Sequence, residues 1–355
     1  MERIEQLRAR FNENDIDGLL ITSPTNRRYM TNFSGTAGVA LVAEKGAVFI
    51  TDFRYVEQAN EQITGFEIVE HRGPITAEVA RQVKKLGVKR LGFEQEHMTF
   101  GIHHTYQQEL DCQLVPVSGI VNELRLRKDQ SEIRILEQAA EIADAAFSHI
   151  TSYIRPGQTE LEVSNELEFF MRKQGAISSS FDIIVASGKR SALPHGVASE
   201  KVIEKGELVT LDFGAYYKGY CSDITRTVAV GEPGEELKTI YDTVLQAQLK
   251  GMAEIKPGMT GRQADAITRD YITDKGYGKY FGHSTGHGLG MEVHEGPSLS
   301  TKSETVLAPG MVVTVEPGIY VSDVGGTRIE DDTLITETGN RSLTSSPKEL
   351  LILGE

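Results

Sequence analysis

The chain has 355 residues, 39% of them hydrophobic and 25% charged, which is the composition of a soluble globular protein with about two domains. Its formal net charge of −14 and the lack of a basic run argue against a nucleic acid or an anionic membrane as partner, because both require concentrated lysine and arginine. Two distant cysteines, an N-terminus without an apolar signal core and no apolar stretch of roughly 18 residues together predict a cytoplasmic protein.

The first third of the chain alternates helical and strand patterns, which predicts a compact α/β unit ending near Val121. Two apolar runs at residues 38–44 and 46–52 flank a Lys-Gly turn, a combination typical of a β-hairpin. The other expected elements are helices near residues 1–14, 77–86 and 103–110 and strands at 17–22, 90–94 and 112–117.

A charged stretch over residues 123–147 separates this unit from the rest of the chain. Either Asp129 or Ser131 is expected to cap a helix that runs to about Ile150. We therefore predict a domain boundary near residue 125, with an N-terminal domain at 1–125 and a second domain at 126–355.

The second part of the chain contains a weak internal repeat. "IRPGQTELEV" begins at Ile154 and "IKPGMTGRQA" begins at Ile255, and each places a threonine at the expected N-cap of a helix. The repeat suggests a duplicated, pseudo-twofold domain. The alternative is a common helix–helix turn that happens to occur twice.

Two aspartates lie in a segment that reads as a β-hairpin, residues 208–230 around a "YYKGY" turn. A turn centred on Tyr217 and Lys218 would place Asp212 directly opposite Asp223. Opposed like charges destabilise a strand pair, and a divalent cation would compensate for them. In the alternative interpretation the register is shifted and the aspartates only cap the turn.

Two glutamates interrupt apolar segments further along the chain. Glu316 lies in "MVVTVEPGIYV" and Glu330 in "GGTRIEDDTLIT", so both are expected in strands and at least partly buried. A buried carboxylate is costly unless it is paired or binds a metal. An ion pair between Glu330 and Arg328 is the simpler alternative for one of them.

Histidine is concentrated in "GHSTGHGLGMEVHEG", residues 282–296, which holds His283, His287 and His294 out of nine in the chain. The segment matches neither a Walker-type phosphate loop nor the dinucleotide-binding glycine pattern. Histidine is a common metal ligand and titrates near neutral pH, so the cluster indicates a metal site or acid–base chemistry.

Taken in order, these residues resemble the pita-bread metallopeptidases. The matching motifs are "LDFGAYYKGYCSDITRT", "GHSTGHGLGMEVHE", "VEPGIY" and "GGTRIED", and the N-terminal unit is similar to that of prolidases and aminopeptidases P. The resemblance implies an α/β N-terminal domain followed by an α+β pita-bread catalytic domain. Family members are commonly dimers, so we expect a homodimer.

The resemblance also implies a two-metal site held by Asp212, Asp223, His287, Glu316 and Glu330. Asp223 and Glu330 would bridge the two ions. Four carboxylates and one imidazole suit Mn²⁺, with Co²⁺ and Zn²⁺ as alternatives. His195, His283 and His294 would lie near the substrate, and Arg328 would position ligands.

The activity implied is hydrolysis of the bond between an N-terminal residue and proline in a short peptide. His294 or His283 would stabilise the oxyanion, and Glu316 would pass a proton to the leaving nitrogen. A dipeptidase is the leading expectation and an aminopeptidase acting on longer peptides the alternative, because Ser298 stands where many prolidases have an arginine. A non-catalytic binding protein and a metal-free creatinase are further alternatives, which a measurement of bound metal would distinguish.

Overall fold

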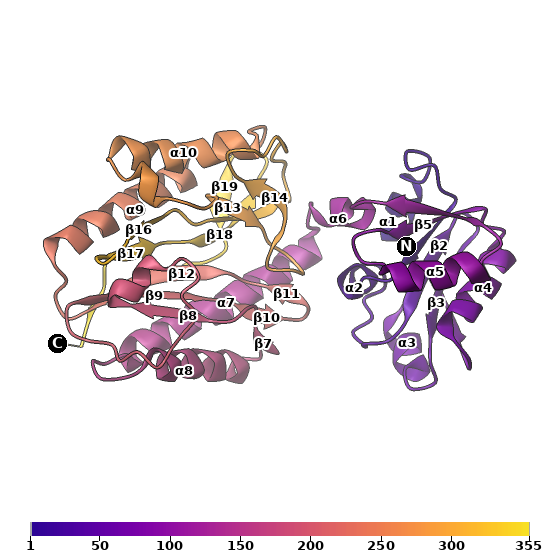
Figure 1. Ribbon diagram of the computed structural model, residues 1–355, viewed down its shortest axis with the longest axis horizontal. Coiled ribbons are helices and arrows are strands. Elements are labelled where there is room, and N and C mark those ends of the chain that lie inside the picture. Colours follow the sequence, from indigo (N-terminus) through magenta and orange to yellow (C-terminus); the bar gives the residue numbers. More distant parts are fainter. Residues whose placement is uncertain (1, 355) are drawn as a thin grey trace. The chain divides into compact units, whose positions relative to one another are not determined.

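The computed structural model describes residues 2–354, and the chain divides into two compact units at 1–125 and 126–355 (Figure 1). The elements of the first unit are α1 (Glu2–Arg8), β1 (Gly18–Ile21), α2 (Pro24–Thr31), β2 (Val39–Ala43), β3 (Gly46–Thr51), α3 (Val56–Gln62), β4 (Glu67–Glu70), α4 (Ile75–Leu86), β5 (Arg90–Glu94), α5 (Phe100–Glu109), β6 (Gln113–Val117) and α6 (Ile120–Arg125).

The first unit is built on one six-stranded mixed sheet in the order β4-β3-β2-β1-β5-β6. The predicted hairpin is confirmed, since β2 and β3 pair antiparallel with Ala43 opposite Gly46. The helix expected over residues 1–14 is shorter, because α1 ends at Arg8 and the chain then passes through turns to Asp15, whose φ is 53°. Asn and Asp are poor helix formers, and left-handed backbone stops a helix. Met1 lies outside the described residues.

The second unit carries two sets of sheet and helix. Its elements are α7 (Gln130–Tyr153), α8 (Glu160–Lys173), β7 (Ser178–Ser179), β8 (Ile184–Ser187), β9 (Glu207–Phe213), β10 (Ala215–Tyr217), β11 (Tyr220–Cys221), β12 (Ile224–Val230), α9 (Glu235–Glu254), α10 (Gly261–Asp274), β13 (Gly286–Gly288), β14 (Glu295–Leu299), β15 (Val312–Val315), β16 (Gly318–Val321), β17 (Gly325–Arg328), β18 (Asp331–Ile335), β19 (Asn340–Ser342) and β20 (Ile352–Leu353).

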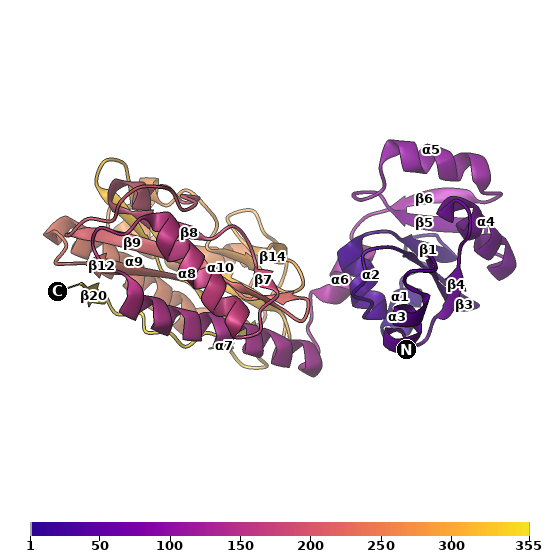
Figure 2. The same ribbon diagram turned by 90° about the horizontal axis from the view of Figure 1, so that it is seen from below.

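Helices cover the outside of this unit and strands fill its middle, with α7 and α8 on one side and α9 and α10 on the other (Figures 1 and 2). The larger sheets have the orders β20-β12-β9-β8 and β14-β13-β15-β18-β19. The apolar faces of α7 and α8 pack on the first sheet in a core that includes Phe147, Leu167 and Leu211. Val313 and Val315 of the second sheet are buried against Ile267 of α10.

The internal repeat extends well beyond the helix–helix turn. Asp129, one of the two predicted candidates, caps α7. Thr159 and Thr260 cap α8 and α10, each with a complete capping box. Thr159 also forms a β-bridge to Val202, and Thr260 forms the corresponding bridge to Val306. Contacts repeated at this distance along the chain favour duplication over coincidence.

The hairpin forms as predicted, but its predicted register is wrong. Asp212 in β9 is opposite Thr225 in β12, so Asp223 is its diagonal neighbour and not its direct partner. The turn is centred one residue later than expected, because Tyr217 pairs with Tyr220 and the positive φ values fall at Lys218 and Gly219. Glycine tolerates this backbone where tyrosine would not. The two aspartates still lie on the same face.

The two glutamates lie between strands rather than within them. Glu316 follows β15 and precedes β16, and Glu330 follows β17 and precedes β18. The chain passes from one sheet to another at each of these points. The amide of Glu316 donates to Thr285 O (2.7 Å) and that of Glu330 to Thr225 O (3.1 Å), so the backbone remains fixed where each strand ends.

Among residues 2–354, none of the helices is long and apolar enough to cross a bilayer.

Candidate metal centre

One cavity of about 490 Å³ in the second unit gathers residues from distant parts of the sequence. The predicted site residues all line it: His195, Asp212, Asp223, His283, His287, His294, Glu316, Arg328 and Glu330. Residues from both halves of the repeat, such as Asp212 and Glu316, therefore meet at one cavity.

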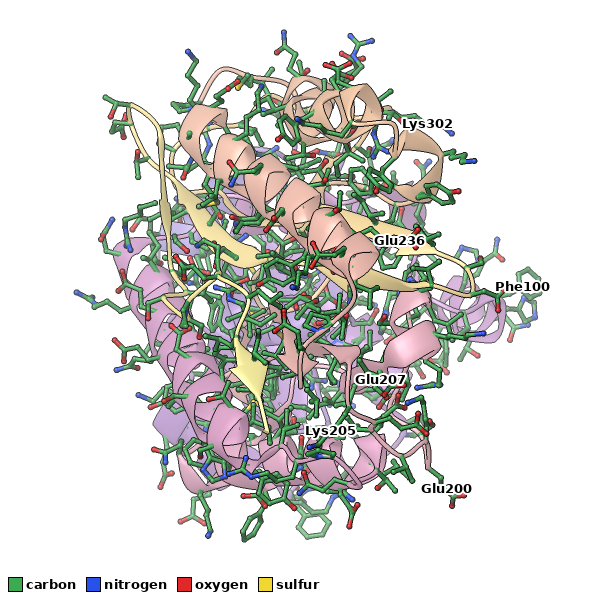
Figure 3. All side chains as sticks on the ribbon, turned by 90° about the vertical axis from the view of Figure 1, so that its left-hand side faces the viewer. Phe100, Glu200, Lys205, Glu207, Glu236 and Lys302 are labelled. Atoms are coloured by element: carbon green, nitrogen blue, oxygen red, sulfur yellow. The ribbon has the colours of Figure 1, made fainter. Side chains whose placement is uncertain are left out.

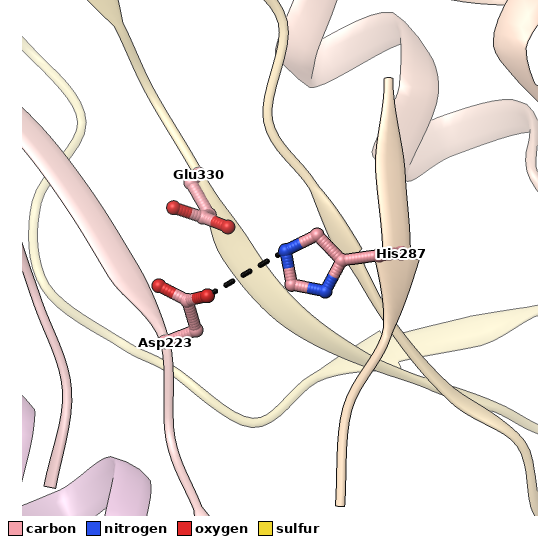
Figure 4. A group of neighbouring side chains, drawn as sticks. All are labelled: Asp223, His287 and Glu330. Atoms are coloured by element: carbon pink, nitrogen blue, oxygen red, sulfur yellow. Dashed lines mark ion pairs between the residues drawn. The ribbon is translucent and has the colours of Figure 1, made fainter. Parts of the chain in front are cut away.

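The centre of the site is a group of three side chains from β12, β13 and β18 or the residues beside them (Figure 4). Ligand atoms of Asp223, His287 and Glu330 all lie within 4.8 Å of one another. His287 Nε2 is 3.7 Å from Asp223 Oδ2 and 3.4 Å from Glu316 Oε1. A single cation could contact the ligand atoms of Asp223, His287 and Glu330 at once.

His287 is in the form that binds metals. Burial, together with the neighbouring His294, lowers its pKa to about 4, so the imidazole is neutral at pH 7. Its Nδ1 lies 3.2 Å from Gly288 O and can donate a hydrogen bond there. The lone pair of Nε2 then points toward the carboxylates, as in metal sites where the second ring nitrogen is held by a carbonyl.

The carboxylates lack partners for several of their oxygens. Asp212 Oδ1, Asp223 Oδ1 and Glu330 Oε1 are buried and accept no hydrogen bond from the described residues. Leaving buried polar atoms unpaired is costly. A divalent cation would satisfy these oxygens, and a largely oxygen ligand set with one imidazole suits such an ion. The residues present therefore fit a metal centre.

The raised pKa values of the carboxylates also indicate a site for a cation. Burial raises the pKa of Asp223 and of Glu330 well above their usual values, and neighbouring carboxylates raise them further. Burial also raises the pKa of Glu316 to about 8. Without positive charge, these groups retain protons at neutral pH. Bound cations would reverse this and hold the site ionised.

Arg328 organises the side of the cavity next to Asp212. Its Nη2 donates to Asp212 Oδ2, so the ion pair that the sequence suggested with Glu330 is not formed. Its other nitrogens donate to Thr225 Oγ1 (3.1 Å), Tyr320 Oη (2.8 Å) and Pro194 O (3.1 Å). Neighbouring phenol and carboxylates outweigh burial and raise its pKa, so the guanidinium stays charged.

His283 and His294, the other two histidines of residues 282–296, differ in how many protein partners their ring nitrogens have. His283 Nδ1 lies 2.8 Å from Ser284 O and its Nε2 lies 2.7 Å from Tyr320 Oη, so both of its nitrogens have protein partners. His294 is exposed at the cavity, and its ring centre is 4.4 Å from that of His287. Of the two, His294 is therefore better placed to meet a substrate.

Several neighbours of the site were not anticipated from the sequence. Phe181, Ile184, Val197 and Val293 line the cavity, but apolar residues carry no motif that would distinguish a cavity wall from a core. Thr225 donates to Glu330 Oε2 (2.6 Å), and Asp332 Oδ2 accepts from the Asp223 amide (3.0 Å). The consecutive acids of "IEDD" were a signal for Asp332.

Comparison with known families agrees with this geometry. Residues 134–337 match the model of metallopeptidase family M24. The chain belongs to this family. Residues 3–127 match the creatinase/prolidase N-terminal domain. The predicted pita-bread family and two-part fold are thereby confirmed, and this M24 protein is a peptidase of a family that uses divalent metals.

Three solved structures are similar over nearly the whole length of this M24 peptidase. A structure described as an Xaa-Pro dipeptidase from Bacillus anthracis is 66% identical, with 99% of each chain covered and a TM-score of 0.99. A prolidase from Pyrococcus horikoshii is 40% identical, covering 99% of this chain and 100% of the other, with a TM-score of 0.94. An X-Pro aminopeptidase from Thermotoga maritima is also 40% identical, covering 96% and 99%, with a TM-score of 0.91.

Proposed function

We propose that this protein hydrolyses the peptide bond between an N-terminal residue and proline, as an Xaa-Pro dipeptidase. The observation that carries the proposal is the set of buried carboxylate oxygens without hydrogen-bond partners around His287 Nε2, in a cavity large enough for a short peptide. The descriptions of the similar proteins from Bacillus anthracis and Pyrococcus horikoshii support the substrate class.

For the ligands we propose Asp212, Asp223, His287, Glu316 and Glu330, holding two divalent ions of which Mn²⁺ fits best. When bound, such ions supply Lewis acidity and a water whose pKa is lowered to near neutral. Asp212 Oδ2 accepts a hydrogen bond from Arg328, and Asp212 Oδ1 has no partner. This arrangement suits a metal ligand whose carboxylate is oriented by a neighbouring side chain.

The other roles follow from which groups are free to meet the peptide. His294, which is exposed at the cavity, donates a hydrogen bond to the oxyanion. Glu316 lies close enough to His287 and the ligand cluster to pass a proton to the proline nitrogen, which must be protonated to leave. His195 contacts the peptide from the cavity wall, and His283 with Tyr320 and Arg328 holds the surrounding geometry.

An Xaa-Pro aminopeptidase is the second candidate, and Ser298 is the observation that favours it. Ser298 is exposed and lines the cavity, and a serine there offers no guanidinium to a dipeptide's carboxylate. The similar X-Pro aminopeptidase from Thermotoga maritima supports the same alternative. We further propose a cytoplasmic homodimer that uses no nucleic acid or membrane partner, consistent with the acidic composition.

The test is hydrolysis of Ala-Pro and Ala-Pro-Ala by protein loaded with Mn²⁺, with chelator-treated protein as control. The dipeptidase proposal expects release of proline from Ala-Pro that disappears on chelation. Cleavage of the tripeptide but not of the dipeptide would contradict the dipeptidase proposal and support an aminopeptidase. Bound metal below one ion per chain without cleavage of either peptide would instead support a binding protein.

A further inference from the structure

Residues 188–198 form a loop whose middle is one wall of the cavity. Pro194, His195 and Val197 all line the cavity from this loop. The loop begins with a short 3-10 helix at Gly188–Ala192, and His195 itself is exposed. An exposed histidine receives little orientation from packing, so its position depends on how the loop backbone is held.

Both ends of this loop are held by one carboxylate, that of Glu160 at the first position of α8. Its Oε1 accepts from the amide (2.8 Å) and the hydroxyl (2.9 Å) of Ser187, just before the loop. Its Oε2 accepts from the amide (3.1 Å) and the hydroxyl (2.7 Å) of Ser199, just after it. The Glu160 side chain is 0% exposed, so water does not compete for these bonds.

Arg190 extends this arrangement into the loop. Its Nη1 donates to Glu160 Oε2, and its Nη2 donates to Val197 O (2.9 Å). One guanidinium therefore joins the buried carboxylate to the backbone two residues after His195. Charge-assisted bonds of this kind are shorter and stronger than neutral ones. Removing the Glu160 charge would release both ends of the loop and its arginine together.

The other half of the repeat has no carboxylate at the corresponding position. Gly261 occupies the position that corresponds to Glu160, since the amides of Glu160 and Gly261 donate to Lys201 O (3.0 Å) and Thr305 O (2.9 Å) respectively. A Cβ at Gly261 would lie 2.1 Å from Ser298 O. In that half the backbone packs directly on the helix, so the carboxylate belongs only to the half that carries His195.

We propose that Glu160 is a positioning residue that sets the affinity for the peptide by holding the loop of His195. The proposal rests on the proposed function, because it assumes that a peptide binds in this cavity. Glu160 does not line the cavity and contacts none of the proposed ligands. Its loss should therefore change peptide binding and leave metal binding intact.

The experiment compares Glu160→Gln and Ser199→Ala with Glu200→Gln. Glu200 is a matched control, because it is an exposed glutamate next to Ser199 whose side chain projects from the surface in Figure 3. For Ala-Pro we expect KM to rise about tenfold in Glu160→Gln, the size of a lost charge-assisted contact of about 1.4 kcal/mol, with kcat and metal content near wild type. Ser199→Ala should shift KM in the same direction by less, and Glu200→Gln should not shift it.

A double-mutant cycle with His195→Ala distinguishes a positioning role of Glu160 from a nonspecific loss of structure. If Glu160 acts through His195, adding Glu160→Gln to His195→Ala should raise KM little further, because the two losses are then not additive. Fully additive losses, or a metal content that falls with activity, would overturn the proposal. If Glu160→Gln does not fold, Ser199→Ala and Ser187→Ala make the same comparison.

A readout without substrate keeps this inference distinct from the proposed function. The side-chain NMR signal of His195, assigned by its loss in His195→Ala, should shift or split in Glu160→Gln and remain in place in Glu200→Gln. An unchanged signal would contradict the inference even if Ala-Pro is cleaved. A wild-type protein that cleaves no Xaa-Pro peptide would contradict the proposed function whatever the signal does.

Discussion

Arg328 and Asp212 form a buried ion pair at the cavity, although 116 residues separate them in the sequence. The pairing leaves Asp212 Oδ1 without a hydrogen-bond partner. One oxygen of the carboxylate is thus fixed while the other remains available to a cation. The arginine sets the direction of a proposed ligand without being one.

Replacing this arginine with lysine tests its role. Lysine keeps the charge but cannot reproduce four directed contacts from a planar group. We expect Arg328→Lys to lose about 10–100-fold in metal affinity or activity, as for other groups that orient metal ligands. Metal titration and kcat/KM measure the two effects. Arg341→Lys, at an arginine that pairs with Glu137 away from the cavity, should show neither.

Asp223→Asn removes a proposed bridging ligand with almost no change in size. We expect activity to disappear and metal content to fall, because an amide oxygen is a poor substitute for a carboxylate between two cations. Elemental analysis of purified protein measures the metal. Asp182→Asn is the control for metal content, since Asp182 is an exposed acid of the same cavity outside the cluster. Retained metal with near-normal turnover would rule out the bridging role.

His294→Ala should lower kcat by a factor on the order of 10²–10³, the usual loss for one oxyanion donor. The metal content should not change, because His294 is exposed at the cavity and is not one of the five proposed ligands. Single-turnover kinetics and elemental analysis on the same preparation test both parts. If metal and activity fall in parallel, His294 is a ligand and the assignment is wrong.

Ser298 should govern the choice between dipeptides and longer peptides. Without an arginine at this position, we expect Ala-Pro-Ala to be cleaved within roughly tenfold of Ala-Pro in kcat/KM, a gap of about 1.4 kcal/mol. Ser298→Arg should shift the ratio toward the dipeptide, whose carboxylate it can pair. Ser300→Arg adds the same charge outside the cavity lining and should leave the ratio unchanged. If the wild-type enzyme does not cleave tripeptides, another side chain binds the carboxylate of the dipeptide.

The stability of metal-free protein should fall as pH rises through the neutral range. Burial raises the pKa of Glu316 from an ordinary 4.5 to about 8, so the folded form retains a proton that the unfolded chain releases. Protonation of Glu316 therefore stabilises the fold fully below pH 4.5, and this contribution is lost as pH approaches 8. The contributions of His283 and His287 to stability change with pH in the opposite direction. Burial lowers both pKa values to about 4 from 6.5, so each stabilises the fold when it is neutral. Their contribution rises with pH only up to about 6.5.

The window from about pH 6.5 to 8 therefore isolates the carboxylates. There we expect the melting temperature of chelator-treated protein to decrease with pH, while the increase on adding Mn²⁺ grows, because the ligands must lose protons to bind it. Differential scanning calorimetry at several pH values measures both. A metal-induced shift that is independent of pH would contradict the raised pKa values.

Local sequence determined much of this protein. The Lys-Gly hairpin and the two threonine caps follow from short-range chemistry and formed as predicted, and Asp129 is the one of two candidates that caps α7. The motifs around Asp212, His287, Glu316 and Glu330 were sufficient to indicate the family, which the family model confirms.

The tertiary structure alone decided the contacts between distant segments. The hairpin register depends on a turn at Lys218 and Gly219, whose left-handed backbone no alternation pattern specifies. Arg328 pairs with Asp212 and not with nearby Glu330, because strand ends from both halves of the repeat meet at the cavity. The same holds for Glu160, which looks in sequence like an ordinary first-turn helix residue. Only the packed chain brings Ser187 and Ser199 to its carboxylate, since hydrogen bonds are directional and fix a partner only after the backbone is in place.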